Sequence, residues 1–147
     1  MLIFNLSGDE ENEDWLRHTL RHPLAALETD AILTGRGLPH PAAYGTFPRI
    51  LGRYVRELRL IPLEEAVRKM TSFCAQRLGI KDRGTLRAGN CADITLFDPA
   101  TVTARATYAE PRQFPVGILY VVINGKVVVE RGTYHGDRKA GQVLRRT

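Results

Sequence analysis

The sequence predicts a mixed α/β fold, with helices and two strands in residues 1–80 and a mostly β arrangement in residues 84–147. Three observations support this prediction. The chain opens with a strand, helix, strand order, which is typical of parallel βαβ units. Two segments with apolar residues at helical spacing follow. The remainder alternates apolar runs with glycine turns, and Asn124-Gly125 is a strong two-residue hairpin signal.

The first two elements are a short strand over Leu2–Leu6 and a helix that Pro23 ends. Ser7 and Glu10 have the spacing of a capping box, and acids precede bases along the helix, as its dipole favours. His18 and His22 have the i, i+4 spacing of a metal pair. They lack the glutamate of an HExxH motif, so we interpret them as ordinary helix-end residues.

A second strand is predicted over Leu24–Glu28 and leads through Asp30 into a long loop over residues 31–46. Two strands alone cannot form a parallel sheet with a buried face, so their neighbours must come from elsewhere. Ligands of parallel α/β folds lie beyond the carboxyl ends of strands, so Asp30 is a candidate catalytic carboxylate. The alternative is a plain turn residue, because aspartate after a strand often forms a turn.

Two helices are expected next. Phe47, Ile50, Leu51, Tyr54, Val55 and Leu58 recur at helical spacing, with Thr46 as cap and Pro48 in the first turn. A stronger apolar stripe follows Pro62 as far as Leu78, and Gly79 is a good helix stop. Cys74 lies on that stripe and is interpreted as a small buried hydrophobe.

Three strands are predicted after residue 84. They cover Ala92–Phe97, Val116–Ile123 and Lys126–Glu130, the last two joined by the Asn-Gly hairpin.

Composition narrows the function classes. Of 147 residues, 44% are hydrophobic and 25% charged, as in ordinary globular proteins, and no apolar run is long enough to span a bilayer. No secretory signal is evident, so a cytoplasmic protein without membrane partners is expected. The net charge of +5 comes from scattered bases without an aromatic-basic motif, so nucleic-acid binding is the weaker interpretation.

Several motifs follow one another in a recognisable order. His22-Pro23 leads to Thr29-Asp30-Ala31, and the matching run Pro39–Tyr54 follows. Matching segments later in the chain are Ala66–Thr71, Arg77–Gly79, Asp82–Gly84, Gly89 with Ala92-Asp93, Phe97–Pro99, Pro115–Ile118 and Val122–Gly125. Together they resemble the C-terminal part of the N-acyl-D-amino-acid deacylases, or D-aminoacylases, of the amidohydrolase superfamily.

The resemblance implies a fold and an activity. Residues 1–80 would be the last β/α units of a metal-dependent (β/α)8 barrel with C-terminal helices, and residues 81–147 part of a small β-sandwich. The complete enzyme would use zinc to hydrolyse small-molecule N-acyl-D-amino acids. By match, Asp30 would take the water proton and deliver it to the leaving amine. The metal ligands would lie outside this chain, so tight zinc binding and activity are not expected of it alone.

The resemblance also places His40 and Tyr44 in a loop over the active site, near substrate. The alternative is that His40 hydrogen-bonds within a proline-flanked turn and Tyr44 packs beneath it. Thr29 and Ala31 replace the family's usual Ser and Gly, and Ala42 stands where Arg is usual. Alanine at position 31 would alter the backbone if that position requires a positive φ.

A different class of function stays open. The chain could be a non-catalytic binding or assembly module, whose unpaired strand edges are completed by a partner chain or by self-association.

Overall fold

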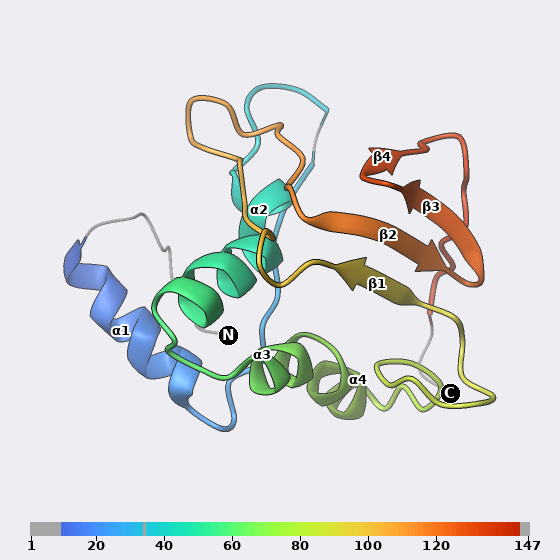
Figure 1. Cartoon of the computed structure of the whole chain (residues 1–147), viewed down its shortest axis with the longest axis horizontal. Coiled ribbons are helices and arrows are strands. Elements are labelled where there is room, and N and C mark those ends of the chain that lie inside the picture. The colour runs from blue at the N-terminus through green and yellow to red at the C-terminus, as the bar shows by residue number, and fades with distance from the viewer. Residues whose placement is uncertain (1–9, 34, 145–147) are drawn as a thin grey trace.

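The computed structural model describes residues 10–33 and 35–144 as helices on one side and an antiparallel sheet on the other (Figure 1). The helices are α1 (Glu10–Arg21), α2 (Ala42–Arg49), the π-helical η1 (Ile50–Glu57), α3 (Leu63–Met70) and α4 (Ser72–Leu78). The strands are β1 (Ile94–Phe97), β2 (Ile118–Ile123), β3 (Lys126–Glu130) and β4 (Thr133–Tyr134). The strand predicted over residues 2–6 and the Ser7 cap lie outside the described residues.

Helix α1 ends at Arg21, ahead of Pro23, as predicted. It is fastened to η1 by a forked ion pair, in which Arg53 Nη2 lies 2.8 Å from Glu13 Oε1 and Arg53 Nε lies 3.0 Å from the same oxygen. This charge-assisted hydrogen bond lowers the pKa of Glu13, with a further attraction from Arg17. Glu13 of α1 therefore has a structural role.

The strand predicted over Leu24–Glu28 is wrong. These residues run without strand pairing, and their backbone groups bond to helices instead. The Leu27 N–H donates to the Lys69 carbonyl at 3.2 Å, and Arg68 Nη2 donates to the Pro23 carbonyl at 3.2 Å. An apolar run alone does not determine which groups its backbone hydrogen-bonds to. Here the backbone partners lie at the α3–α4 junction.

The helix predicted to begin near Thr46 begins earlier, at Ala42. Thr46 is not the cap, because its hydroxyl donates back to the Ala42 carbonyl at 2.9 Å. Pro48 therefore lies inside the helix rather than in its first turn. Proline has no N–H to donate and its ring crowds the preceding turn. Two residues later the hydrogen bonds widen to the π register, as Leu58 N–H to Arg53 O at 2.8 Å shows.

The helix predicted after Pro62 forms as two helices. Thr71, with φ −129° and ψ −91°, breaks it between α3 and α4. Gly79 ends α4 in the left-handed conformation at φ 74°, as expected of a helix stop. Cys74 is half-buried, and its Sγ lies 3.0 Å from the Lys69 carbonyl beside the break.

The β half confirms its three predicted strands. All neighbours in the order β1-β2-β3-β4 are antiparallel. Asn124 and Gly125 join β2 to β3 with φ of 47° and 78°. Two consecutive positive φ values are those of a type I′ turn, whose twist suits a hairpin.

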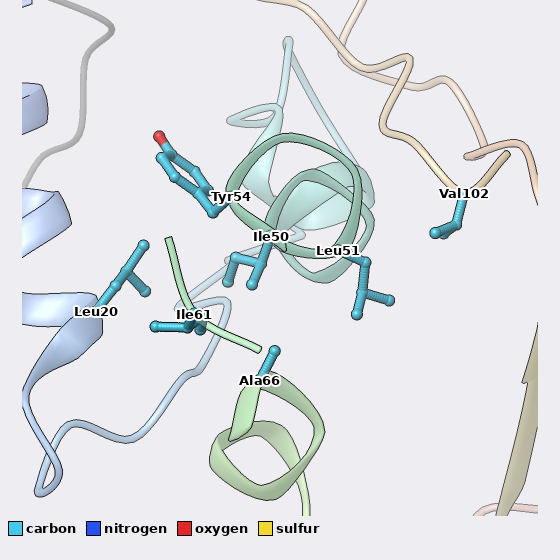
Figure 2. Close-up of a cluster of buried hydrophobic side chains, with 7 residues drawn as sticks. All are labelled: Leu20, Ile50, Leu51, Tyr54, Ile61, Ala66 and Val102. Atoms are coloured by element: carbon cyan, nitrogen blue, oxygen red, sulfur yellow. The ribbon is translucent and has the colours of Figure 1, made fainter. Parts of the chain in front are cut away.

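One core joins the two halves. It consists of Leu20, Ile50, Leu51, Tyr54, Ile61, Ala66 and Val102, shown in Figure 2. Six of these come from the helical half, whereas Val102 lies between β1 and β2 in sequence. Gly52 and Gly117 make room for the Val102 backbone, because a Cβ at Gly117 would lie 2.5 Å from Val102 Cα. Within the described ranges, no helix is long and apolar enough to cross a membrane.

Candidate active site

The segment that leads to Asp30 is held along its length by the α3–α4 junction. Lys69 is fully buried, and its ammonium donates to the carbonyls of His22 and Ala25. Leu27 bonds to the Lys69 carbonyl and packs on the core. Asp30 thus lies three residues beyond the last anchored position of an otherwise unpaired segment.

Asp30 has a positive φ of 40°. This conformation is uncommon for residues other than glycine, although aspartate tolerates it better than most, and such residues cluster at functional sites. The side chain is exposed, and its carboxylate has no hydrogen-bond or ion-pair partner among the described residues. Ala31 is not among the residues with positive φ, so alanine at that position carries no backbone penalty.

His40 lies just before the N-cap of helix α2, which is Pro41, and its ring bonds to the first amide of the helix. Its Nδ1 accepts the Ala42 N–H at 3.1 Å, so the ring proton lies on Nε2, which donates to Tyr108 Oη at 3.1 Å. The two rings meet edge to face, with centroids 5.3 Å apart. His40 thus has a structural partner on each ring nitrogen, although its ring remains exposed.

Tyr44 lies in the first turn of α2 and packs edge to face on Phe114, with centroids 5.7 Å apart. Arg112, from the same irregular segment as Phe114, donates from Nη2 to the Gly37 carbonyl at 2.5 Å. These contacts hold the loop after Asp30 beside residues 104–115, and the two loops lie side by side in Figure 1.

A groove of about 480 Å³ opens between these two loops. Its lining residues are Ile32, Leu33, Gly35, Arg36, Leu38, Pro39, His40, Tyr44 and Arg112. Apolar side chains and two guanidinium groups share this surface, which begins two residues after Asp30. The lining therefore combines apolar surface with positive charge.

A metal site needs several convergent donors. No group of three His, Cys, Asp or Glu side chains that could hold a metal ion occurs in residues 10–33 and 35–144. His22 Nδ1 accepts the Leu24 N–H at 3.2 Å, which fits its interpretation as a helix-end residue. The donors in the described part of the chain do not fit a zinc site.

Sequence reasoning missed Lys69, Tyr108 and Arg112. Lys69 carried a usable signal, because it lies three residues after Ala66 and four before Phe73, on the apolar stripe itself. Tyr108 and Arg112 lie in an irregular segment without periodicity, and nothing local marks them as loop partners.

The fold and the sequence together match known proteins. The amidohydrolase family described as Amidohydro_3 matches residues 13–129. The chain belongs to the D-aminoacylase family of amidohydrolases. Two relatives from Alcaligenes xylosoxydans xylosoxydans are a D-aminoacylase, 50% identical over 74% of this chain, and an N-acyl-D-aspartate deacylase, 45% identical over 84% of it.

Solved structures agree with this assignment. N-acyl-D-glutamate deacylase from Bordetella bronchiseptica, crystallised with zinc and a phosphonate inhibitor that mimics the tetrahedral intermediate, superposes with a TM-score of 0.83. It is 43% identical, and the match covers 91% of this chain and 28% of that one. A D-aminoacylase structure gives a TM-score of 0.85 at 41% identity, with the same coverage. The chain spans 22% and 24% of the length of the two curated relatives above. Its mixed α/β fold therefore corresponds to only a part of a deacylase.

Proposed function

We propose that this chain is the C-terminal portion of an enzyme that hydrolyses N-acyl-D-amino acids to a carboxylate and a free D-amino acid. The observation that carries the proposal is Asp30, an unpartnered carboxylate at positive φ on an anchored segment of a deacylase-family chain. Alone, the chain is expected to be inactive.

Asp30 would act as a general base and then as a general acid. Water attacks the acyl carbonyl while the Asp30 carboxylate accepts a water proton. When the C–N bond breaks, the leaving nitrogen takes that proton from Asp30, which returns to its ionised form. His40 and Tyr44 are proposed to line the substrate side of the groove, since both contribute to its wall.

The resemblance implies zinc in the complete enzyme. The described residues of this chain do not supply a zinc site, so the ligands are proposed to come from the rest of that enzyme. The steps assigned to this chain involve only Asp30 and water.

The finer fold assignment is also proposed. Residues 1–80 would contribute the last β/α units of the barrel and residues 81–147 strands of a β-sandwich. The match of residues 13–129 to an amidohydrolase family supports this assignment. In β1, Phe97 packs on the core while Ile94 and Leu96 are exposed, which suits a sheet with a second layer.

The same exposed side chains support the second candidate, a non-catalytic module completed by a partner chain or by self-association. Sedimentation of this chain tests the second candidate, because a clean monomer at every concentration would argue against a module completed by self-association.

A chimera tests the enzyme proposal. The matching C-terminal part of the Alcaligenes D-aminoacylase is replaced by this chain, and hydrolysis of N-acetyl-D-leucine, N-acetyl-D-aspartate and N-acetyl-D-glutamate is measured. We expect a zinc-loaded chimera that hydrolyses at least one D-substrate and spares its L-enantiomer, whereas this chain alone hydrolyses neither. A folded, zinc-loaded chimera without any hydrolysis would contradict the proposal.

A further inference from the structure

Lys69 is the one charged side chain that is buried within the described ranges, and it is 0% exposed. Its Nζ donates to the carbonyl oxygens of His22 and Ala25, the latter at 3.1 Å, and lies 3.6 Å from Glu65 Oε1. A buried ammonium is costly unless it is paired, and here two carbonyl oxygens accept its N–H groups while a carboxylate lies nearby.

The helix itself does not need this charge. Glu65 already pairs with Arg68, whose Nε lies 2.7 Å from Glu65 Oε2 and lowers the pKa of that carboxyl. An apolar side chain would fill the same position between Ala66 and Phe73 on the stripe. The two carbonyls that Lys69 binds belong to a distant segment, 44 and 47 residues earlier in the chain.

The Lys69 backbone holds the same segment farther along. Its carbonyl accepts the Leu27 N–H at 3.2 Å, and this contact lies at the break between α3 and α4. Side chain and carbonyl together therefore fix residues 22, 25 and 27. The next residues lead directly to Asp30 at its positive φ.

We infer that Lys69 is a positioning residue, which holds the segment 22–27 so that the Asp30 carboxylate is presented in one fixed place. The inference rests on the proposed catalytic role of Asp30. The anchoring by Lys69 can be measured without any catalysis. The inference and the proposed role of Asp30 can therefore be refuted independently.

The test is backbone 15N relaxation on this chain, comparing the wild type with Lys69→Met. We expect the order parameters of residues 25–30 to fall from about 0.85 to below about 0.6, while those of β2 and β3 stay unchanged. Lys126→Met, which removes an exposed lysine from β3, is the matched control and should change neither region. Unchanged values in residues 25–30, or an equal fall throughout the chain, would overturn the inference.

A wild-type measurement keeps the inference testable if Lys69→Met fails to fold. The Leu27 amide should exchange with deuterium as slowly as the Ala66 amide of α3, because the two would be released together. Exchange of the Leu27 amide at the rate of an open chain would refute the anchoring.

The effect of Lys69 on catalysis is measured in the chimera described above. Lys69→Met should lower kcat about 100-fold, the order expected when a reacting group is misplaced by about 1 Å, and leave KM within about twofold. An unchanged kcat together with mobile residues 25–30 would show that Lys69 anchors the segment without positioning catalysis. An inactive wild-type chimera would instead count against the proposed function and leave the relaxation result intact.

Discussion

Replacing Val102 by alanine should destabilise both halves of the protein. Val102 is 1% exposed and is the one residue of the seven-residue cluster in Figure 2 that comes from the β half. Removing two methyl groups forfeits about 1.6 kcal/mol of transfer free energy, and the cavity left behind adds about 1 kcal/mol. Backbone of Thr101 and Val102 lies close to Gly117, and the Val102 carbonyl lies close to Gly52, so the site has little freedom to collapse. We therefore expect a loss of about 2–3 kcal/mol in the free energy of unfolding.

Urea denaturation followed by circular dichroism measures this loss. Helical and sheet signals should shift together by roughly 1 M in midpoint, given an m value of about 2 kcal/mol/M. Val67→Ala on α3 is the matched control, because Val67 is 37% exposed and its truncation should cost less than about 0.5 kcal/mol. If Val102→Ala cost no more than Val67→Ala, or if the sheet signal alone shifted, the idea of one shared core would be refuted.

Three further predictions concern the packing at Gly117, the acid stability that Asp93 confers, and DNA binding. Gly117→Ala should cost more than about 3 kcal/mol in urea titrations, because a Cβ at φ 77° would lie 2.5 Å from Val102 Cα; a cost below about 1 kcal/mol would contradict this geometry. The hydrogen bond from the Asn124 N–H, and then Arg83, lower the pKa of Asp93. The ionised Asp93 carboxylate therefore stabilises the folded protein above the ordinary carboxyl pKa, and this stabilisation is lost as pH falls through the lowered pKa. Asp93→Asn should therefore flatten the loss of stability below about pH 4, and equal acid profiles for both proteins would oppose this. Retention on DNA should be negligible even at low salt, and steeply salt-dependent retention would revive the nucleic-acid hypothesis.

Local chemistry made much of the fold predictable. Asn124-Gly125 and Gly79 specify conformations that few other residues adopt easily, so the hairpin and the end of α4 formed where expected. The wrong predictions concern segments whose secondary structure depends on contacts with distant parts of the chain. Residues 24–28 are apolar enough for a strand, but their backbone partners are helical. Helix α2 begins at Ala42, where the His40 ring accepts the first helical N–H, and Thr46 lies inside the helix.

The site was predictable in one respect. Asp30 stood out from its place after an apolar run, and the family resemblance gave it a role that stays a prediction. Its anchoring by Lys69 depends on two segments more than 40 residues apart, which periodicity does not reveal. Tyr108 and Arg112 meet the loop after Asp30 through contacts that span 68 and 75 residues.

The most direct test of the central claim is Asp30→Asn in the chimera, with zinc content measured in both proteins. Asparagine keeps the size of the side chain and tolerates positive φ, so stability and zinc content should be unchanged. Loss of the proton-transferring carboxylate should lower kcat by about 10²–10⁴-fold. Hydrolysis at the unsubstituted rate, with zinc retained, would show that Asp30 is only a turn residue and would contradict the account.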